Sequence, residues 1–257
     1  MTDIADRPEL APELRLVPHA FRRTFGRPAE GVWYAPGVLN LLGGAVKVHA
    51  KWGAIVAGDR RDDGRLELVS VNRPVERVLL PSDEVPRWAA GLGAKGGAAL
   101  MCSVDLPQGS GLSAGEALRT AVGLALRDLA GERFEEPPAT ALDLPGRRLL
   151  VVDTRIRREE PQAERPYTAD TDDLGAALTA YHHVQDPDPE QDAVVRAALA
   201  AGARGASMLI DPPGRPAVAL VDADLVPAVK RAITKAVEVP PRYLTIVPSA
   251  LNTFSVV

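Results

Sequence analysis

Short apolar runs dominate residues 32–57, where Pro-Gly and Gly-Gly pairs interrupt the hydrophobic sequence. Residues 65–80 alternate in part between apolar and polar side chains. A strand has a side-chain period of two, and glycine and proline favour turns, so both stretches are predicted to form strands joined by turns. Residues 83–97 have a helical pattern that ends in glycines, and the apolar run 98–104 predicts a strand.

A glycine-rich turn follows that strand and leads into an Ala- and Leu-rich helix that is predicted to end near residue 130. The segment 148–154, with the sequence RLLVVDT, predicts a buried strand. The other predicted elements are helices at 171–183, 190–201 and 224–237, and strands at 206–210, 217–221 and 243–247.

Composition and charge narrow the classes of partner. The chain has 257 residues, of which 46% are hydrophobic and 25% charged, as expected of a globular protein with one large or two modest cores. Its formal net charge of −4 provides no overall positive field for nucleic acid or an anionic membrane. Small molecules or proteins are therefore the expected partners.

The N-terminal sequence gives no targeting or membrane signal. Residues 1–18 mix Pro, Asp and Glu without a clear period and are interpreted as a flexible leader. They lack a basic start followed by an apolar stretch, and no later run of about 18 apolar residues is long enough to span a bilayer. We expect a cytoplasmic protein that contacts no membrane.

Several reactive side chains have structural interpretations. Cys102 is the single cysteine, lies in an apolar run and is interpreted as core. His182 lies in a helical pattern and is interpreted as a packing residue. The charged run Arg155–Glu160 is interpreted as solvated surface.

The glycine-rich turn carries the strongest chemical signal. It connects a predicted strand to a predicted helix, whose first backbone N–H groups have no partner inside the helix and can wrap an anion. An ordinary strand-to-helix turn is the alternative interpretation of the glycine spacing. The residues expected to contact a nucleotide are Pro107, Gly109, Ser110, Gly111, Leu112 and Ser113.

Five segments, taken in order, resemble galactokinases of the GHMP small-molecule kinase superfamily. Residues 35–43, APGVLNLLG, resemble the family's APGRVNLIG opening, and residues 105–118 resemble its LPxGxGLSSSASL phosphate loop. The strand at 150–154 resembles the family's later DT strand, and the helix at 175–182 resembles its LGxLMxxSH helix. Residues 205–220 bracket the position of its GGGFGG loop.

This resemblance implies a two-lobed α/β (α+β) fold with a mixed-sheet N-terminal lobe and an α+β C-terminal lobe. We expect the lobes to cover residues 19–165 and 166–257. The resemblance also implies ATP and Mg²⁺ as cofactors, a sugar-like substrate and a role in carbohydrate metabolism.

The resemblance assigns further site residues. Asn40, Gly43 and Lys47 would lie at the sugar site, and Ser113 with Glu116 would hold the metal ion. On the first turn of a helix, however, a glutamate can instead simply stabilise the positive end of the helix dipole.

Four departures from the family motifs affect the chemistry. Val38 stands at the position of an arginine that supports the reacting centre. Gly44 and Lys47 replace acidic residues that grip sugar hydroxyls. The segment with the catalytic aspartate is missing, and the short connection in its place carries only Asp143. Residues 210–215, IDPPGR, replace the glycine-rich third loop, and prolines remove backbone donors. No catalytic residue can therefore be assigned.

Three functions remain open. The leading hypothesis is a catalytically degenerate galactokinase-like protein, a pseudokinase, that binds, regulates or scaffolds. The second is a divergent ATP-dependent kinase for a sugar or another small hydroxyl compound. The third is a structural protein partner without a small ligand. The deciding geometry is whether the space over residues 109–113 is open to a triphosphate or filled by Glu116 and neighbouring side chains.

Overall fold

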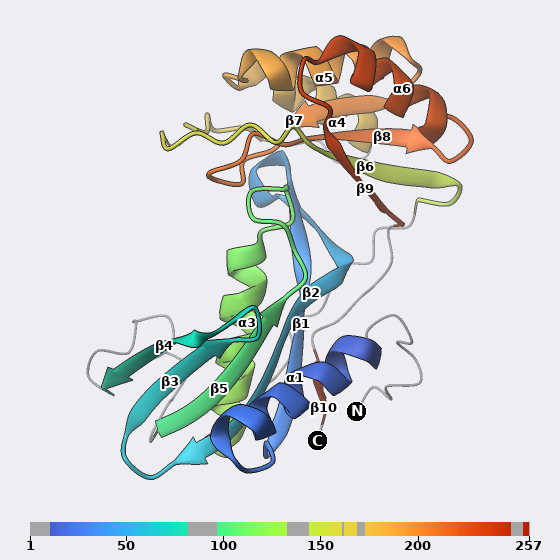
Figure 1. Cartoon of the computed structure of the whole chain (residues 1–257). Helices are drawn as coiled ribbons and strands as arrows, with labels where there is room; N and C mark the ends of the chain where they lie inside the picture. The colour runs from blue at the N-terminus through green and yellow to red at the C-terminus, as the bar shows by residue number, and fades with distance from the viewer. Residues whose placement is uncertain are drawn as a thin grey trace.

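The computed structural model has two lobes, each built on its own sheet (Figure 1). The predicted mixture of helices and strands is confirmed. Within the described helices, none is long and apolar enough to cross a membrane. The structure describes residues 11–81, 97–132, 144–160, 162–168, 173–247 and 254–256.

The N-terminal lobe contains a six-stranded mixed sheet with the order β10-β1-β2-β5-β3-β4. Strand β3 is parallel to β5, and the other neighbours are antiparallel. The strands are β1 (Gly31–Leu41), β2 (Val46–Arg61), β3 (Arg65–Ser70), β4 (Arg73–Pro81), β5 (Gly97–Val104) and β10 (Phe254–Val256). All but β10 were predicted from the pattern. The helix predicted at 83–97 lies almost entirely outside the described residues.

Two helices cover opposite faces of this sheet, α1 (Ala11–Phe25) and α3 (Ala114–Leu129). Neighbouring residues of a strand point to opposite faces. Accordingly, Trp33 lies in the hydrophobic cluster that includes α3, and Tyr34 lies in the cluster that includes α1. The sheet is therefore buried on both sides.

Helix α1 differs from the flexible leader that was expected over residues 1–18. Residues 11–18 lie in this helix, and the side chains of Leu14, Val17 and Phe21 are buried against the sheet. Their spacing of three and four places them on one helical face. Residues 1–10 lie outside the described part of the chain.

The C-terminal lobe contains a four-stranded antiparallel sheet with the order β7-β8-β6-β9. Its elements are β6 (Arg147–Asp153), α4 (Leu174–Val184), α5 (Pro189–Ala200), β7 (Gly205–Met208), β8 (Ala217–Asp222), α6 (Val226–Ala236) and β9 (Arg242–Ile246). Each was predicted from the pattern to within a few residues. Buried His182 packs under β7, where its Nδ1 accepts a hydrogen bond from the Met208 N–H.

The lobe border differs from the expected one near residue 165. Strand β6 lies at the centre of the C-terminal sheet, between β8 and β9, whereas β10 returns to the N-terminal sheet and pairs with β1. An apolar run such as β6 does not reveal from its own sequence which sheet it joins. The C-terminal lobe is thus inserted between β5 and β10 of the N-terminal sheet.

The interpretation of Cys102 as core is supported by its position on β5. Its side chain is buried in the cluster under α3, and burial raises the pKa of the thiol to about 12. The thiolate is therefore essentially absent at neutral pH.

Buried Gln191 joins α5 to the loop between β7 and β8. Its side-chain oxygen accepts a hydrogen bond from the Asp188 N–H and completes the capping box of α5. Its amide nitrogen donates to the carbonyl oxygens of Leu209 (3.1 Å) and Pro216 (2.8 Å). One side chain thus holds both ends of this loop against the helix.

We expect Gln191→Ala to lower the free energy of unfolding by about 2 kcal/mol, because buried carbonyl groups lose their donor. Urea denaturation monitored by circular dichroism measures the change. The exposed Gln108→Ala is the matched control, and its change is expected to stay within about 0.5 kcal/mol. An equal effect of both substitutions would contradict the anchoring role of Gln191.

Candidate functional site

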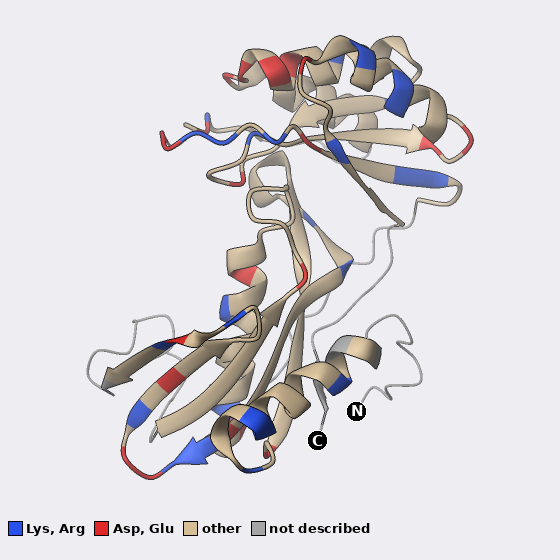
Figure 2. Ribbon diagram, in the orientation of Figure 1, with Lys and Arg blue, Asp and Glu red and all other residues tan. Residues whose placement is uncertain are grey.

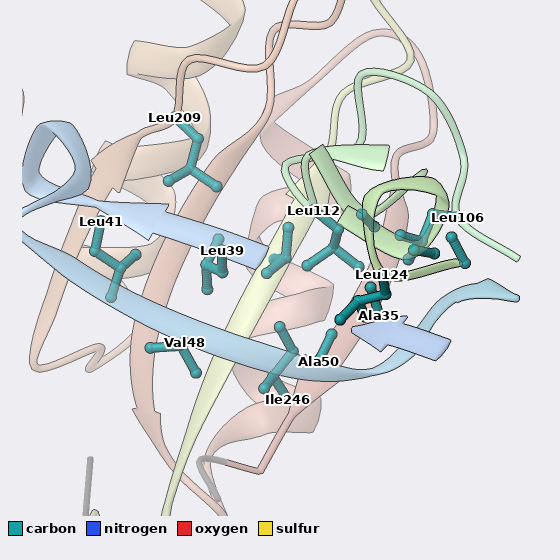
Figure 3. Packing of buried hydrophobic residues seen from close by; sticks show 14 of the residues in the cluster. Ala35, Leu39, Leu41, Val48, Ala50, Leu106, Leu112, Leu124, Leu209 and Ile246 are labelled. Carbon is teal, nitrogen blue, oxygen red and sulfur yellow. The ribbon is translucent and has the colours of Figure 1, made fainter. Parts of the chain in front are cut away.

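The predicted phosphate loop connects β5 to α3 at the end of the N-terminal lobe that faces the C-terminal lobe (Figure 1). Ser110 and Leu112 are completely buried. The Leu112 side chain joins the main hydrophobic cluster together with Leu39 of β1 and Leu209 beyond β7 (Figure 3). The core of the two lobes is therefore continuous beneath the loop.

Strand β1 holds the predicted phosphate loop in place through a backbone hydrogen bond and side-chain packing. A bulge between Pro36 and Val38 interrupts the pairing of β1 with β2, and the Val38 N–H donates to the Leu112 carbonyl (3.1 Å). A Cβ at Gly37 would approach Leu106 Cδ1 to 2.9 Å, so a side chain there would push the loop away. The two motifs that suggested the family resemblance are thus in direct contact.

The backbone of the loop is left-handed at three positions. Gly109 (φ 69°) and Gly111 (φ 97°) are in the left-handed region, which glycine adopts without strain. Ser113, the N-cap of α3, is also left-handed (φ 47°), which is unfavourable for a residue with a Cβ. A strained residue at a helix start is held by its surroundings and often marks a functional position.

The acceptor for the Gly111 amide comes from the C-terminal lobe. The Gly111 N–H donates to Asp211 Oδ2 at 2.7 Å. The Ser113 amide also lies near enough to this carboxylate to lower its pKa. Burial raises the pKa of Asp211 above its ordinary value, while the two amides act in the opposite direction. The residue that reaches the loop is thus Asp211, whereas Glu116 pairs with Asn40 and Lys47.

Asp211 was not predicted as a site residue. The sequence showed an acid directly before Pro212-Pro213 in the segment that replaces a glycine-rich loop, and this position was the available signal. Its partner loop is far away in sequence, so its contact with Gly111 could not be derived from spacing.

The loop that carries Asp211 is in close backbone contact with the predicted phosphate loop. A Cβ at Gly109 would lie 2.6 Å from the Gly214 nitrogen, and a Cβ at Gly214 would overlap the Gly109 carbonyl. Arg157 adds a second link, because its guanidinium binds the buried Asp153 carboxylate and also donates to the Gln108 carbonyl at 3.0 Å. Arg157 is therefore a bracing residue and not merely part of a solvated charge run.

Four of the predicted sugar- and metal-site residues meet at the start of α3. Asn40 and Lys47 are paired neighbours on β1 and β2. Asn40 Nδ2 donates to Ser113 Oγ (3.1 Å) and to Glu116 Oε2 (3.2 Å), and Lys47 Nζ lies 3.3 Å from Glu116 Oε1. The structure thus brings Asn40, Lys47, Ser113 and Glu116 together, although as partners of one another.

Gly43 has different surroundings. It is left-handed (φ 69°), and a Cβ there would overlap the Glu164 carboxylate. The Tyr181 hydroxyl donates to Glu164 Oε1 at 2.8 Å, and burial with the nearby carboxylate raises the pKa of Tyr181. Glu164, which no motif indicated, is thus an acidic group beside the predicted sugar position.

Val38 and Asp143 are the remaining positions at which the sequence departs from the family motifs. Val38 lies on β1 opposite His49, and its apolar side chain is buried. Asp143 lies outside the described residues. Within the described ranges, no group of three or more His, Cys, Asp or Glu side chains is arranged to hold a metal ion.

Charged side chains are distributed over both lobes (Figure 2). A cavity of about 260 Å³ lies in the C-terminal lobe between the start of α5 and the end of α6. Its lining residues include Thr154, Ile156, Glu190 and Val237, and none of the predicted site residues.

Comparison with known proteins finds a homologue. No protein-family model matches the chain. A galactokinase of Streptomyces coelicolor is 27% identical over an alignment of 369 positions that covers 90% of this chain and 95% of that protein. The chain is a homologue of this galactokinase. Because the alignment is longer than the 257-residue chain, this homologue is a shortened form.

Solved structures agree on the fold. The structure of Lactococcus lactis galactokinase complexed with galactose has a TM-score of 0.76 at 16% identity, and the match covers 94% of this chain and 99% of that one. Homoserine kinase from Cytophaga hutchinsonii has a TM-score of 0.56 at 17% identity, with 88% and 96% covered. Methanococcus jannaschii mevalonate kinase has a TM-score of 0.57 at 11% identity, with 83% and 96% covered. The predicted GHMP kinase fold is confirmed.

In the conformation described, the predicted phosphate loop of this galactokinase homologue is in contact with the loop between β7 and β8. The Gly111 N–H is already bonded to Asp211, and Gly214 lies against Gly109. The assignment of residues 107–113 to nucleotide binding stays a prediction.

The contact between the two loops can be tested by adding a single methyl group. We expect Gly214→Ala to lower the free energy of unfolding by about 2 kcal/mol or more, because the new Cβ overlaps the Gly109 backbone. Chemical denaturation measures the change.

Gly115→Ala is the matched control. At Gly115 a Cβ would meet only the Arg119 side chain at 3.5 Å, and alanine is favoured over glycine in a helix by about 1 kcal/mol. This variant is expected to be as stable as the wild type or more stable. A harmless Gly214→Ala would show that the two loops are not in contact.

Proposed function

We propose that this galactokinase homologue is catalytically degenerate and acts as a binding, regulatory or scaffolding protein. One observation carries the proposal. Lys47 stands at the position of a family acid, and it neutralises Glu116, the carboxylate on the first turn of α3. Two groups that the family resemblance assigns to sugar and metal thus bind each other.

Two further features support the loss of phosphoryl transfer. Transfer requires charge neutralisation around the moving phosphoryl group, and an arginine supplies five N–H donors for this purpose. Val38 at the corresponding position offers only a buried apolar side chain. In addition, the third loop presents the Asp211 carboxylate toward the phosphate loop, where a nucleotide would bring like charge.

We expect the purified protein to transfer no phosphate from Mg-ATP to galactose, homoserine or mevalonate, the compounds named for its relatives. Kinases typically turn over at about 1–100 s⁻¹, so a coupled assay for ADP with product analysis by mass spectrometry has a wide detection range.

The double variant Ser113→Ala with Glu116→Gln controls for contaminating kinases. Any turnover that persists in this variant belongs to a contaminant. A wild-type rate in the enzyme range that disappears in the variant would refute the proposed degeneracy.

A divergent kinase is the second candidate, and one observation favours it. Ser113 Oγ and the Glu116 carboxylate both accept hydrogen bonds from Asn40 Nδ2, and Asn40 Oδ1 is buried with no hydrogen-bond partner among the described residues. Oxygen atoms of this kind are the ligands that Mg²⁺ prefers. A Mg²⁺-dependent rise in melting temperature with ATP would support this candidate, and saturating ATP without effect would count against it.

A further inference from the structure

The Asp211 carboxylate accepts a hydrogen bond from the Gly111 N–H of the predicted phosphate loop. We propose that the Asp211 carboxylate is the resident anion of the phosphate loop, and that it excludes external phosphate groups from the start of α3. The inference deepens the proposed function and rests on it, because a loop occupied in this way explains how the fold can persist without its nucleotide.

The chemistry of the two partners is complementary. The first N–H groups of a helix lack intrahelical acceptors and carry the positive end of the helix dipole. The Gly111 N–H lies just before the N-cap of the 16-residue helix α3 and donates to Asp211, so the carboxylate lies close to this positive end. A carboxylate presents two oxygen acceptors with negative charge, as a phosphate does, so it satisfies the same donors.

Asp211 is held in place by its own loop. The Gly214 N–H donates to the Asp211 carbonyl at 2.9 Å, and the Arg158 N–H donates to the Pro213 carbonyl at 2.9 Å. Buried Arg215 binds Asp188 and donates to the Glu160 carbonyl at 2.6 Å. A tethered group reaches its site at a high effective concentration, which a dissolved anion must overcome.

The charges around Asp211 also disfavour a second anion. Arg157 is the neighbouring cation, but its guanidinium is already bound in two places to the Asp153 carboxylate. The carboxylates of Asp153 and Asp211 therefore share the single guanidinium of Arg157. An incoming phosphate would add negative charge without a new cation to balance it.

Removal of the carboxylate should open the site to a small anion. We expect Asp211→Ala to melt about 3–9 °C below the wild type, because charge-assisted hydrogen bonds at the helix start are lost. Inorganic phosphate should then restore part of the lost melting temperature of Asp211→Ala. It should bind this variant at least about tenfold more tightly than it binds the wild type. Thermal melting in phosphate, compared with sodium chloride of equal ionic strength, measures both effects.

Two further variants make the result specific. Asp211→Asn keeps an oxygen that accepts from the amides but carries no charge, so it should fold well and bind phosphate more tightly than the wild type. Asp224→Ala removes the same charge from an exposed turn after β8 and should respond to phosphate as the wild type does.

The outcomes separate a resident anion from a merely structural contact. If both Asp211 variants respond to phosphate no more than Asp224→Ala, the inference is overturned, even if Asp211→Ala is less stable. It is also overturned if the wild type binds phosphate as tightly as Asp211→Ala. The proposed function is judged separately by the transfer assay on the wild type, because that result does not depend on the phosphate response of the variants.

Discussion

The backbone amides at the start of α3 need an acceptor, and in this protein the C-terminal lobe provides it. Buried N–H groups without partners are costly, so the Gly111 N–H needs an anion, a water molecule or a side chain as its acceptor. Asp211 supplies this acceptor from the loop between β7 and β8, 100 residues further along the chain.

The surrounding residues work mainly as supports. Gln191 holds both ends of the β7–β8 loop, Arg157 ties β6 to the phosphate loop, and the bulge in β1 lets Val38 bind the loop from below. Beneath them, Leu112 and Leu209 make the hydrophobic core continuous between the lobes (Figure 3). A site that a kinase family uses to position a ligand is thus satisfied here by the chain's own groups.

Most of the fold could be predicted because its elements have strong local patterns. Apolar runs such as β6 and the glycine-rich start of α3 retain their periodicity and turn residues. Helix α1 was missed because Pro18 and the acidic residues before it obscured the apolar spacing, and β10 was missed because three residues carry little periodic signal. The family resemblance assigned Asn40 to the sugar site and Ser113 to the metal site, but it did not predict their contact. That contact and the roles of Asp211 and Arg157 depend on long-range contacts that local sequence does not encode.

The pairing of β10 with β1 has a consequence for the order of folding during synthesis. Val32 pairs with Val256, so the ribosome must complete the whole C-terminal lobe before this edge of the N-terminal sheet can close. The C-terminal sheet consists of β6 to β9 and does not include β10, so it can form while β1 still has an open edge. Contacts with large sequence separation form slowly, and open strand edges invite pairing with other chains. Nascent molecules are therefore most exposed to aggregation through β1, until the last strand arrives.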